Sequence, residues 1–163
     1  MSDPDKVTTC LWFDTQGEDA AKFYTSLVPH SSITHVSRYG PGMPMPEGTA
    51  MVVKFTLGGA SYMALNGGPM FKHSEAASIV VSCDDQAEVD RLWSALAADG
   101  GKAVQCGWLK DRYGLSWQIV PRRLEQLMTD PDSAKRQRTM AALMQMVKLD
   151  IGKLEAAHRG DGT

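Results

Sequence analysis

The chain has 163 residues, of which 43% are hydrophobic and 22% are charged, and its formal net charge is -2. This length suits one domain, or two small modules sharing a core, and the near-neutral charge offers no general attraction to nucleic acid or anionic lipid. The first residues lack the basic and apolar regions of a secretory signal, and no apolar run approaches a membrane span, so we expect a cytoplasmic protein with no nucleic-acid or membrane partner.

Residues 1–69 are predicted to form a first module with four strands and one helix. The expected strands cover residues 7–14, 32–39, 50–57 and 60–65, and the expected helix covers residues 17–28. Apolar residues on both sides of the alternation in the first strand predict that both of its faces are buried. Three prolines and three glycines make residues 40–48 a loop, and Gly58-Gly59 suits the turn of a hairpin.

Residues 70–121 are predicted to form a second module in the same order. A strand at residues 77–83 leads to a helix at residues 86–98, which Asp84-Asp85 caps and Gly100-Gly101 ends. Residues 102–108 are expected to be extended, and residues 106–121 to form a β-hairpin with aromatic-rich arms around a polar turn at residues 111–114. The two βαβββ modules make an internal repeat, and neither alone covers both faces of its sheet.

Residues 122–163 are predicted to form a C-terminal helical extension. The expected helices cover residues 122–128, residues 130–147 with Pro131 at the first helical position, and residues 151–158 between an Asp150 cap and Gly160. Met140, Leu143, Met144 and Val147 form an apolar stripe, which indicates a core or dimer contact rather than a cofactor site. The basic residues at 135–138 are expected to be a solvated helix face.

The three cysteines are Cys10, Cys83 and Cys106, and their spacing contains no CxxC pair. They therefore indicate neither a disulfide framework nor a thiolate zinc site, and a small buried hydrophobic side chain is the simplest interpretation of each. Cys106 differs because it begins the hairpin, where Lys110 or Arg112 would lower the pKa of a solvent-facing thiol.

Several segments together match a known pattern in their order and spacing: residues 11–14, Glu18, 20–21, 23–24, 65–69, 78–85, 106–121, 130–131 and 140–149. They resemble the vicinal oxygen chelate superfamily, which includes glyoxalase I, bleomycin-resistance proteins, fosfomycin-resistance enzymes and extradiol dioxygenases. The chain is most similar to its PhnB-like branch, also labelled the 3-demethylubiquinone-9 3-methyltransferase family. The resemblance implies an α+β fold, in which two βαβββ modules form an incurved eight-stranded mixed sheet followed by C-terminal helices, and it implies a homodimer.

Metal-using members of this superfamily hold their cation with His, Gln or Glu side chains inside the sheet. The resemblance places the corresponding positions at Thr9, Ser78 and Gln118, which carry only neutral oxygen or amide groups. Transition metals prefer anionic or imidazole ligands, so we expect no metal and no cofactor. His73, just ahead of the second module's first strand, is the best placed of the four histidines to be an exception.

Strand alternation predicts a pocket in the second module. It sets Ser78, Val80, Ser82, Ser116, Gln118 and Val120 on one face, and leaves Ile79, Val81, Trp117 and Ile119 for the helix side. Small polar and apolar residues on a concave face are typical of a small-molecule site. The candidate ligand-binding residues are Thr9, Ser78, Gln118, Trp12, Tyr62, Trp108, Cys106 and Ser116. The alternative is that Ser78 and Gln118 only bond each other in a filled core, and that the aromatic residues only pack.

Three functions are compatible with these features. The favoured hypothesis is a metal-free protein that sequesters or carries a small, partly apolar molecule. The second is a metal-independent enzyme of the isomerase or lyase type, with Cys106, Lys110, Asp111 or Arg112 as candidate groups and no assigned catalytic residue. The third takes the methyltransferase label literally, and it ranks last because the glycine pairs lead into extended or irregular sequence instead of the helix that S-adenosylmethionine sites use.

Overall fold

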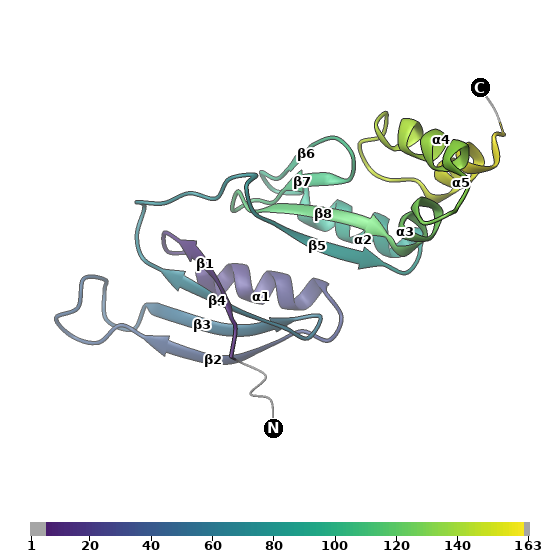
Figure 1. The fold of residues 1–163 in the computed structure, drawn as a ribbon. Helices are drawn as coiled ribbons and strands as arrows, with labels where there is room; N and C mark the ends of the chain where they lie inside the picture. The colour runs from purple at the N-terminus through teal and green to yellow at the C-terminus, as the bar shows by residue number, and fades with distance from the viewer. Residues whose placement is uncertain (1–5, 162–163) are drawn as a thin grey trace. The chain divides into compact units, whose positions relative to one another are not determined.

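The computed structural model describes residues 6–161, which divide into two compact units on either side of the boundary between His73 and Ser74 (Figure 1). The first unit contains β1 (Thr9–Phe13), α1 (Gly17–Leu27), β2 (Ser32–Arg38), β3 (Ala50–Leu57) and β4 (Ala60–Asn66). The second contains β5 (Ser78–Cys83), α2 (Gln86–Leu96), β6 (Lys102–Ala103), β7 (Trp108–Lys110), β8 (Ser116–Pro121), α3 (Arg122–Met128), α4 (Ser133–Leu143) and α5 (Ile151–Arg159). No helix within the described residues is long and apolar enough to cross a membrane.

Each unit contains a four-stranded mixed sheet, and the two sheets have equivalent topology. The strand order is β1-β4-β3-β2 in the first sheet and β5-β8-β7-β6 in the second. In both sheets the first and last strands of the module pair in parallel, while the other neighbours pair antiparallel. The predicted repeat of two βαβββ modules in an α+β fold with C-terminal helices is therefore confirmed.

In the first unit, one face of the sheet packs against α1. Leu11, Phe13, Val53, Phe55 and Ala64 lie on this face and are buried with the inner side of the helix. Asn66 fixes the start of α1, because its Oδ1 accepts a hydrogen bond from the Gly17 N–H at 2.7 Å while its Nδ2 donates to the Ala50 carbonyl at 3.0 Å. A Cβ at Gly17 would crowd the Asn66 side chain, so the residue at this position must be small.

The prediction that both faces of the first strand are buried is wrong for β1. Leu11 and Phe13 are buried, whereas Cys10 is exposed and Trp12 is half-buried. Only the α1 side of this sheet is covered by a helix of its own unit, so the alternate residues of β1 face outward from that layer.

In the second unit, α2 covers one face of the sheet. Its residues Val89, Leu92 and Leu96 are buried, as are Leu109, Trp117 and Ile119 on the strands beneath it. The Asp85 carboxylate caps the helix by accepting a hydrogen bond from the Glu88 N–H at 2.8 Å, as the sequence predicts.

Residues 102–108 are not continuously extended, contrary to the prediction from the sequence. Two short strands, β6 and β7, form instead, because Cys106 and Gly107 have φ values of 60° and 81° and reverse the chain between them. The hairpin of β7 and β8 is confirmed, and its turn closes with a 2.9 Å hydrogen bond from the Gly114 N–H to the Asp111 carbonyl.

The C-terminal helices pack around Leu127, Leu149 and Leu154 in the second unit. The second predicted helix is shorter at both ends: α4 begins at Ser133 after an Asp132 cap and ends at Leu143. It stops because the following segment turns away to bond the loop before β7, where the Cys106 and Gly107 N–H groups donate to the carbonyls of Met146 and Val147.

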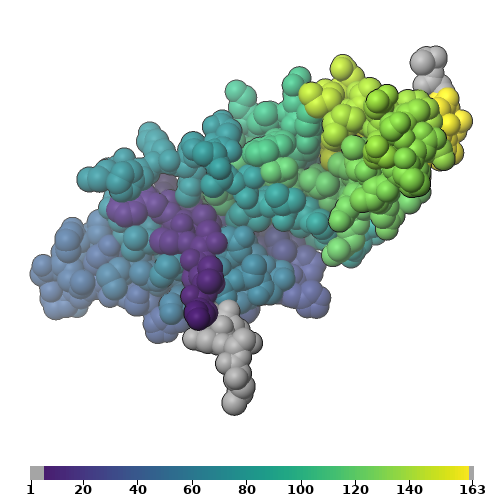
Figure 2. Space-filling view, in the orientation of Figure 1, coloured from purple at the N-terminus to yellow at the C-terminus, as the bar shows by residue number. Residues whose placement is uncertain are grey.

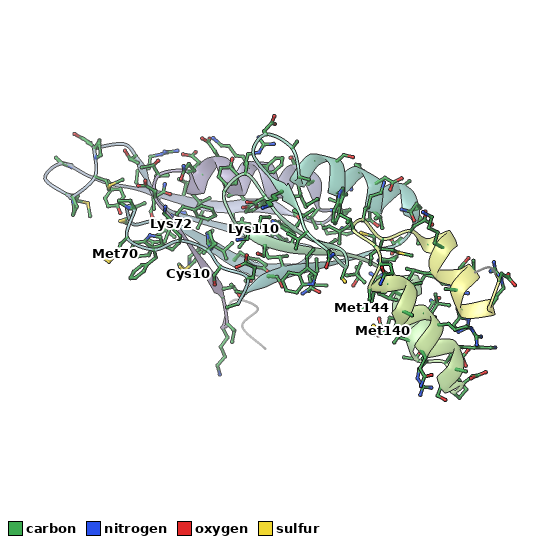
Figure 3. The ribbon with its side chains drawn as sticks, turned by 90° about the horizontal axis from the view of Figure 1, so that it is seen from above. Cys10, Met70, Lys72, Lys110, Met140 and Met144 are labelled. Carbon is green, nitrogen blue, oxygen red and sulfur yellow. The ribbon has the colours of Figure 1, made fainter. Side chains whose placement is uncertain are left out.

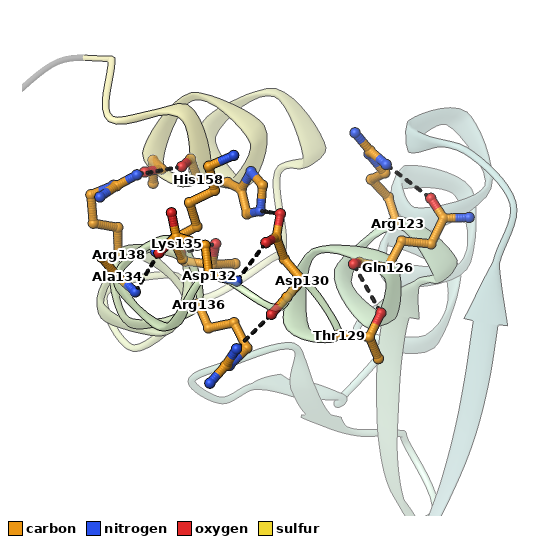
Figure 4. A network of polar contacts seen from close by, with 12 residues as sticks. Arg123, Gln126, Thr129, Asp130, Asp132, Ala134, Lys135, Arg136, Arg138 and His158 are labelled. Atoms are coloured by element: carbon orange, nitrogen blue, oxygen red, sulfur yellow. Dashed lines mark hydrogen bonds and ion pairs between the residues drawn. The ribbon is translucent and has the colours of Figure 1, made fainter.

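The basic residues of α4 do more than face solvent, contrary to the prediction (Figure 4). The Arg138 guanidinium donates to the carbonyls of Ala157 and His158 and so caps the end of α5, while Arg136 donates to the Asp130 carbonyl. The Asp130 carboxylate also pairs with His158 at 3.1 Å. These contacts tie α5 to α4, which lies at the surface of the second unit (Figure 2).

Candidate functional site

The face of the second sheet opposite α2 carries the predicted pocket residues. We call this surface the open face and define it by Ser78, Val80, Ser82, Trp108, Lys110, Ser116, Gln118 and Val120, which the pairing of β5, β7 and β8 sets on one side. The alternation is as predicted: Trp117 and Ile119 are fully buried on the helix side, whereas Gln118 and Val120 are only half-buried. Val80, at the centre of β5, is 55% exposed.

One polar contact and one hydroxyl that has no partner within residues 6–161 define the polar groups of this face. The Gln118 Nε2 donates a hydrogen bond to the Ser78 Oγ at 3.0 Å, so the expected alternative, in which these two side chains bond each other, is present. Ser116 is different, because it is 1% exposed and its Oγ has no hydrogen-bond partner among the described residues. A buried hydroxyl normally has a partner, so the Ser116 Oγ is, within the part of the chain that the structure describes, an unsatisfied polar group beneath the surface of the open face.

The charged groups of the hairpin turn are engaged in structure. Asp111 is 2% exposed, and its carboxylate accepts hydrogen bonds from the N–H groups of Tyr113 at 2.8 Å and Leu115 at 3.1 Å, and from the Trp117 indole at 2.9 Å. Such a carboxylate holds the turn on the strand and has little capacity left for acid–base chemistry.

The neighbouring cationic groups are ion-paired. Lys110 bonds Glu75, and Arg112 lies 3.1 Å from Asp99. Lys110 nevertheless emerges from the open face, since it pairs with Ser116 across β7 and β8. From the sequence, Lys110 is identified only as a neighbour of Cys106 and as a candidate group of an enzyme. The alternation of residues 108–110 would also have placed it among the ligand-binding candidates.

Cys106 lies outside the strands and therefore apart from the open face. Its half-buried thiol is 3.9 Å from the Met144 Sδ. Trp108, two residues later, is half-buried and lies beside Gln118. Of the candidates in the second unit, the structure thus gathers Ser78, Trp108, Ser116 and Gln118 on one surface.

The candidates in the first unit divide between two faces of its sheet. Thr9 and Tyr62 are paired neighbours on the side of Leu11 and Phe13, which α1 covers. Tyr62 stacks on Phe55 with ring centroids 5.6 Å apart, and burial raises the pKa of its phenol.

Trp12 lies on the opposite face of this sheet from Thr9 and is held in place by packing. Its indole donates to the Gly68 carbonyl at 2.9 Å, its ring meets Phe71 edge-on, and a Cβ at Gly67 would collide with it. Cys10 shares this face by alternation, and Figure 3 shows it at the surface of the first unit. Thr9 and Cys10 are adjacent on β1, so their side chains point to opposite faces of the sheet. A predicted ligand position one residue further along would have been Cys10, which lies on the helix-free face.

The donor groups at the superfamily's ligand positions do not fit a divalent metal. Thr9 lies on the α1 side of its sheet, and Ser78 and Gln118 are neutral groups that bond each other. Within residues 6–161, no three His, Cys, Asp or Glu side chains gather closely enough to hold an ion. His73 packs edge-on against the Phe13 ring, with centroids 5.2 Å apart.

Comparison with known proteins gives a consistent result. Residues 5–120 match the model of the family described as 3-demethylubiquinone-9 3-methyltransferase. The chain belongs to this family. A PhnB protein from Bacillus cereus is 35% identical, with a TM-score of 0.66, and the match covers 71% of this chain and 98% of that one. Membership confirms the expected vicinal oxygen chelate superfamily.

Two further structures share the fold at lower identity. Protein PA1353 from Pseudomonas aeruginosa is 22% identical, covers 71% of this chain and 96% of its own, and has a TM-score of 0.59. The fosfomycin resistance protein FosX from Listeria monocytogenes is 12% identical, covers 74% of this chain and 94% of its own, and has a TM-score of 0.50. No curated protein matches the chain.

Among residues 6–161, the glycines do not form the S-adenosylmethionine turn that the family's description implies. Gly58-Gly59 is the hairpin turn of β3 and β4, with φ values of 54° and 87°, and Gly67 packs under Trp12. At Gly17, where β1 leads into α1, the Asn66 side chain fills the space next to the backbone. These residues leave no open glycine-rich loop at the start of a helix.

Proposed function

We propose that this protein binds a small, partly apolar organic molecule on the open face without using a metal ion. Exposed Val80 and half-buried Trp108 and Val120 offer apolar contact area. The half-buried Gln118 amide supplies a polar contact of the kind that orients a neutral ligand. The observation that carries the proposal is the sheet face opposite α2, where Val80 is 55% exposed at the centre of β5 beside the Gln118 amide.

The proposal is tested with 1-anilinonaphthalene-8-sulfonate, a fluorescent apolar probe, and with one variant on the open face. We expect saturable binding by the wild-type protein and its loss in Val80→Arg, because a guanidinium there would occupy the surface. Val104→Arg, which changes an exposed valine in the loop between β6 and β7, is the matched control. Equal binding by both variants would refute the proposed location.

Metal independence has its own measurement. Native mass spectrometry of freshly purified protein should show no stoichiometric transition metal on the chain, whether or not an organic ligand is retained. Zinc, nickel or iron retained in proportion to protein, and lost from Gln118→Ala, would overturn this part of the proposal.

A metal-independent enzyme on the same surface is less well supported. The Asp111 carboxylate already accepts hydrogen bonds from three donors, and Arg112 and Lys110 are ion-paired. The glycines within the described residues do not form a loop of the kind that binds S-adenosylmethionine, so they do not support a methyltransferase activity. Calorimetry with S-adenosylmethionine tests this activity directly. Micromolar binding would restore that hypothesis.

We further propose that the chain forms a homodimer in the cytoplasm. Each sheet is covered by a helix of its own unit on one face only, and large apolar side chains such as Met70 and Phe71 are exposed in the chain. Sedimentation equilibrium over a range of concentrations tests the pairing, and a constant monomer mass would exclude it.

A further inference from the structure

Two sulfur atoms of the second unit meet outside the open face, and a third sulfur-containing side chain lies one helical turn away. The Cys106 Sγ, in the loop between β6 and β7, lies 3.9 Å from the Sδ of Met144 at the end of α4. Met140 precedes Met144 by one helical turn, and the Met144 N–H donates to the Met140 carbonyl at 3.0 Å, so both side chains share a helix face. Figure 3 shows the two methionines next to each other on α4.

The separation of the two sulfur atoms suits joint coordination of one metal ion. If each metal–sulfur bond is about 2.3 Å, as for thiolate sites, then sulfurs 3.9 Å apart subtend an angle of about 115° at the metal. This angle lies between the tetrahedral and trigonal values, so it is compatible with an ion that takes at least one further ligand. Met140 supplies a thioether on the same side of the helix.

We propose that Cys106, Met140 and Met144 form a binding site for Cu(I). One thiolate and two thioethers are soft ligands, which favour Cu(I) over Zn(II) or Mg(II). Binding replaces the thiol proton: Cys106–SH and Cu⁺ give Cys106–S–Cu and H⁺, with no change of oxidation state. Both methionines are solvent-accessible, at 41% and 55% exposed, so an ion can reach the site without unfolding the chain.

The loop that carries Cys106 is held against the methionine segment. The N–H groups of Cys106 and Gly107 donate to the carbonyls of Met146 at 2.8 Å and Val147 at 2.9 Å. Gly107 packs closely on Leu149, where a Cβ would lie 3.1 Å from the leucine side chain. These contacts fix the thiol near the end of α4 before any ion arrives, which lowers the entropy lost on binding.

Cys106 itself has a backbone conformation that is unusual for its residue type. Its φ of 60° lies in the left-handed region, which costs a residue with a Cβ of order 1 kcal/mol or more. The surrounding hydrogen bonds maintain this conformation. Strained residues of this kind gather at functional sites, and the thiol of this residue lies 3.9 Å from the Met144 Sδ.

The site is independent of the proposed open-face function. Met140 and Met144 belong to the C-terminal helices, which lie beyond residues 5–120, the part that matches the family. Loss of Cu(I) binding would therefore leave the binding of an apolar probe at Val80 unaffected, and the two proposals can fail separately.

The test is an anaerobic titration in which the protein competes with bathocuproine disulfonate for Cu(I). We expect the wild-type chain to withdraw Cu(I) from the chelator. Cys106→Ser and Met144→Leu should each weaken binding by at least about tenfold, the scale seen when even a supporting contact of a metal ligand is lost. Met140→Leu should weaken it as well. Ag(I) should compete for the site, and Zn(II) should not.

Cys10→Ser is the matched thiol control, since it removes the exposed cysteine of the first unit and leaves the sulfur cluster intact. It should retain wild-type affinity. The proposal is overturned if Cys106→Ser binds Cu(I) like the wild type, if Cys10→Ser alone abolishes binding, or if Met144→Leu has no effect. Far-UV circular dichroism of each variant shows that altered affinity does not come from misfolding.

Discussion

At the scale of single residues, Asp111 shows how a charged side chain can be part of a core. It lies in a turn, where charged residues usually face water, yet its carboxylate is 2% exposed and accepts hydrogen bonds from two backbone N–H groups and the Trp117 indole. The indole is fully buried under α2. Asp111 therefore joins the hairpin turn to the core of the second unit.

Replacement of Asp111 by alanine should destabilise the protein strongly. The three donors would lose their acceptor, and each buried donor left without a partner costs roughly 1–3 kcal/mol. We expect a loss of at least about 3 kcal/mol in urea unfolding, allowing for water entering near the turn. Glu75→Ala, which removes the exposed partner of Lys110, should change stability far less. Equal effects would mean that Asp111 is not structural.

Cys83 gives a prediction about pH. Burial, with a smaller contribution from Glu88, raises the pKa of its thiol from 9.0 to about 12 in the folded protein. The thiol therefore stays protonated in the folded state while that of the unfolded chain ionises above pH 9. Stability that is complete below pH 9 should fall as pH rises toward about 12.

Comparison of the wild type with Cys83→Ala isolates this effect from the titration of other groups. The alanine variant will be less stable at pH 7, because its buried side chain is smaller than that of cysteine. The difference in unfolding free energy between the two proteins should shrink between about pH 9 and 11, because only the wild type loses stability through the thiol. Urea midpoints measured across this range provide the check. A difference that stays constant with pH would show that the Cys83 thiol ionises equally in both states.

At the scale of elements, one glutamine joins α2 to the C-terminal helices. The Gln86 Nε2 donates to the Leu149 carbonyl at 3.0 Å, and its Oε1 accepts from the Ile151 N–H at 2.8 Å. The side chain thus satisfies both backbone groups at the entrance to α5. Since Leu149 and Leu154 belong to the same buried cluster, this contact positions the last helix on its core.

Gln86→Ala should loosen α5 more than α2. Two backbone groups would lose their partner at a cost of about 1–3 kcal/mol, and α5 should exchange its amide hydrogens faster than in the wild type. Hydrogen exchange followed by mass spectrometry resolves the two helices. Gln137→Ala, on the exposed side of α4, is the control and should leave exchange in α5 unchanged. Faster exchange in α2 alone would contradict the proposed role of Gln86.

At the scale of the whole molecule, periodic burial explains why most elements could be predicted. Burial alternates in β8 from Trp117 to Pro121 because one face packs on α2, and capping residues such as Asp85 mark where helices begin. Where the sequence-based predictions fail, contacts between residues distant in sequence determine the structure. The end of α4 at Leu143 depends on hydrogen bonds between residues distant in sequence, and no local pattern announces the left-handed conformation of Cys106.

The candidate site could be predicted only in part for the same reason. Alternation placed Ser78, Ser116 and Gln118 on one face, but only the folded chain shows that Gln118 bonds Ser78 while the Ser116 hydroxyl is buried alone among the described residues. Thr9 was selected by spacing along the chain, and the register of β1 shows that this residue lies on the helix side.

The C-terminal extension raises a question that concerns the whole molecule, because the family match ends at residue 120 and α3 begins at Arg122. The match with the Bacillus cereus relative covers 98% of that chain but only 71% of this one. A βαβββ pair therefore does not require an extension of this kind. In this chain, however, Gly107 and Val120 pack against the helical cluster of Leu127, Leu149 and Leu154.

We therefore expect a chain shortened to end at Pro121 to fold and to be less stable. It should keep the circular dichroism of its strands, lose helical signal, and unfold at a lower urea concentration, because the apolar surface around Val120 becomes exposed. Leu154→Ala in the full chain is the comparison: a cavity in the cluster should cost about 2–5 kcal/mol while the helices remain. An unchanged midpoint for the shortened chain would show that the extension contributes no stability to the modules, and a fully unfolded product would show that this chain, unlike its relative, depends on these helices for its fold.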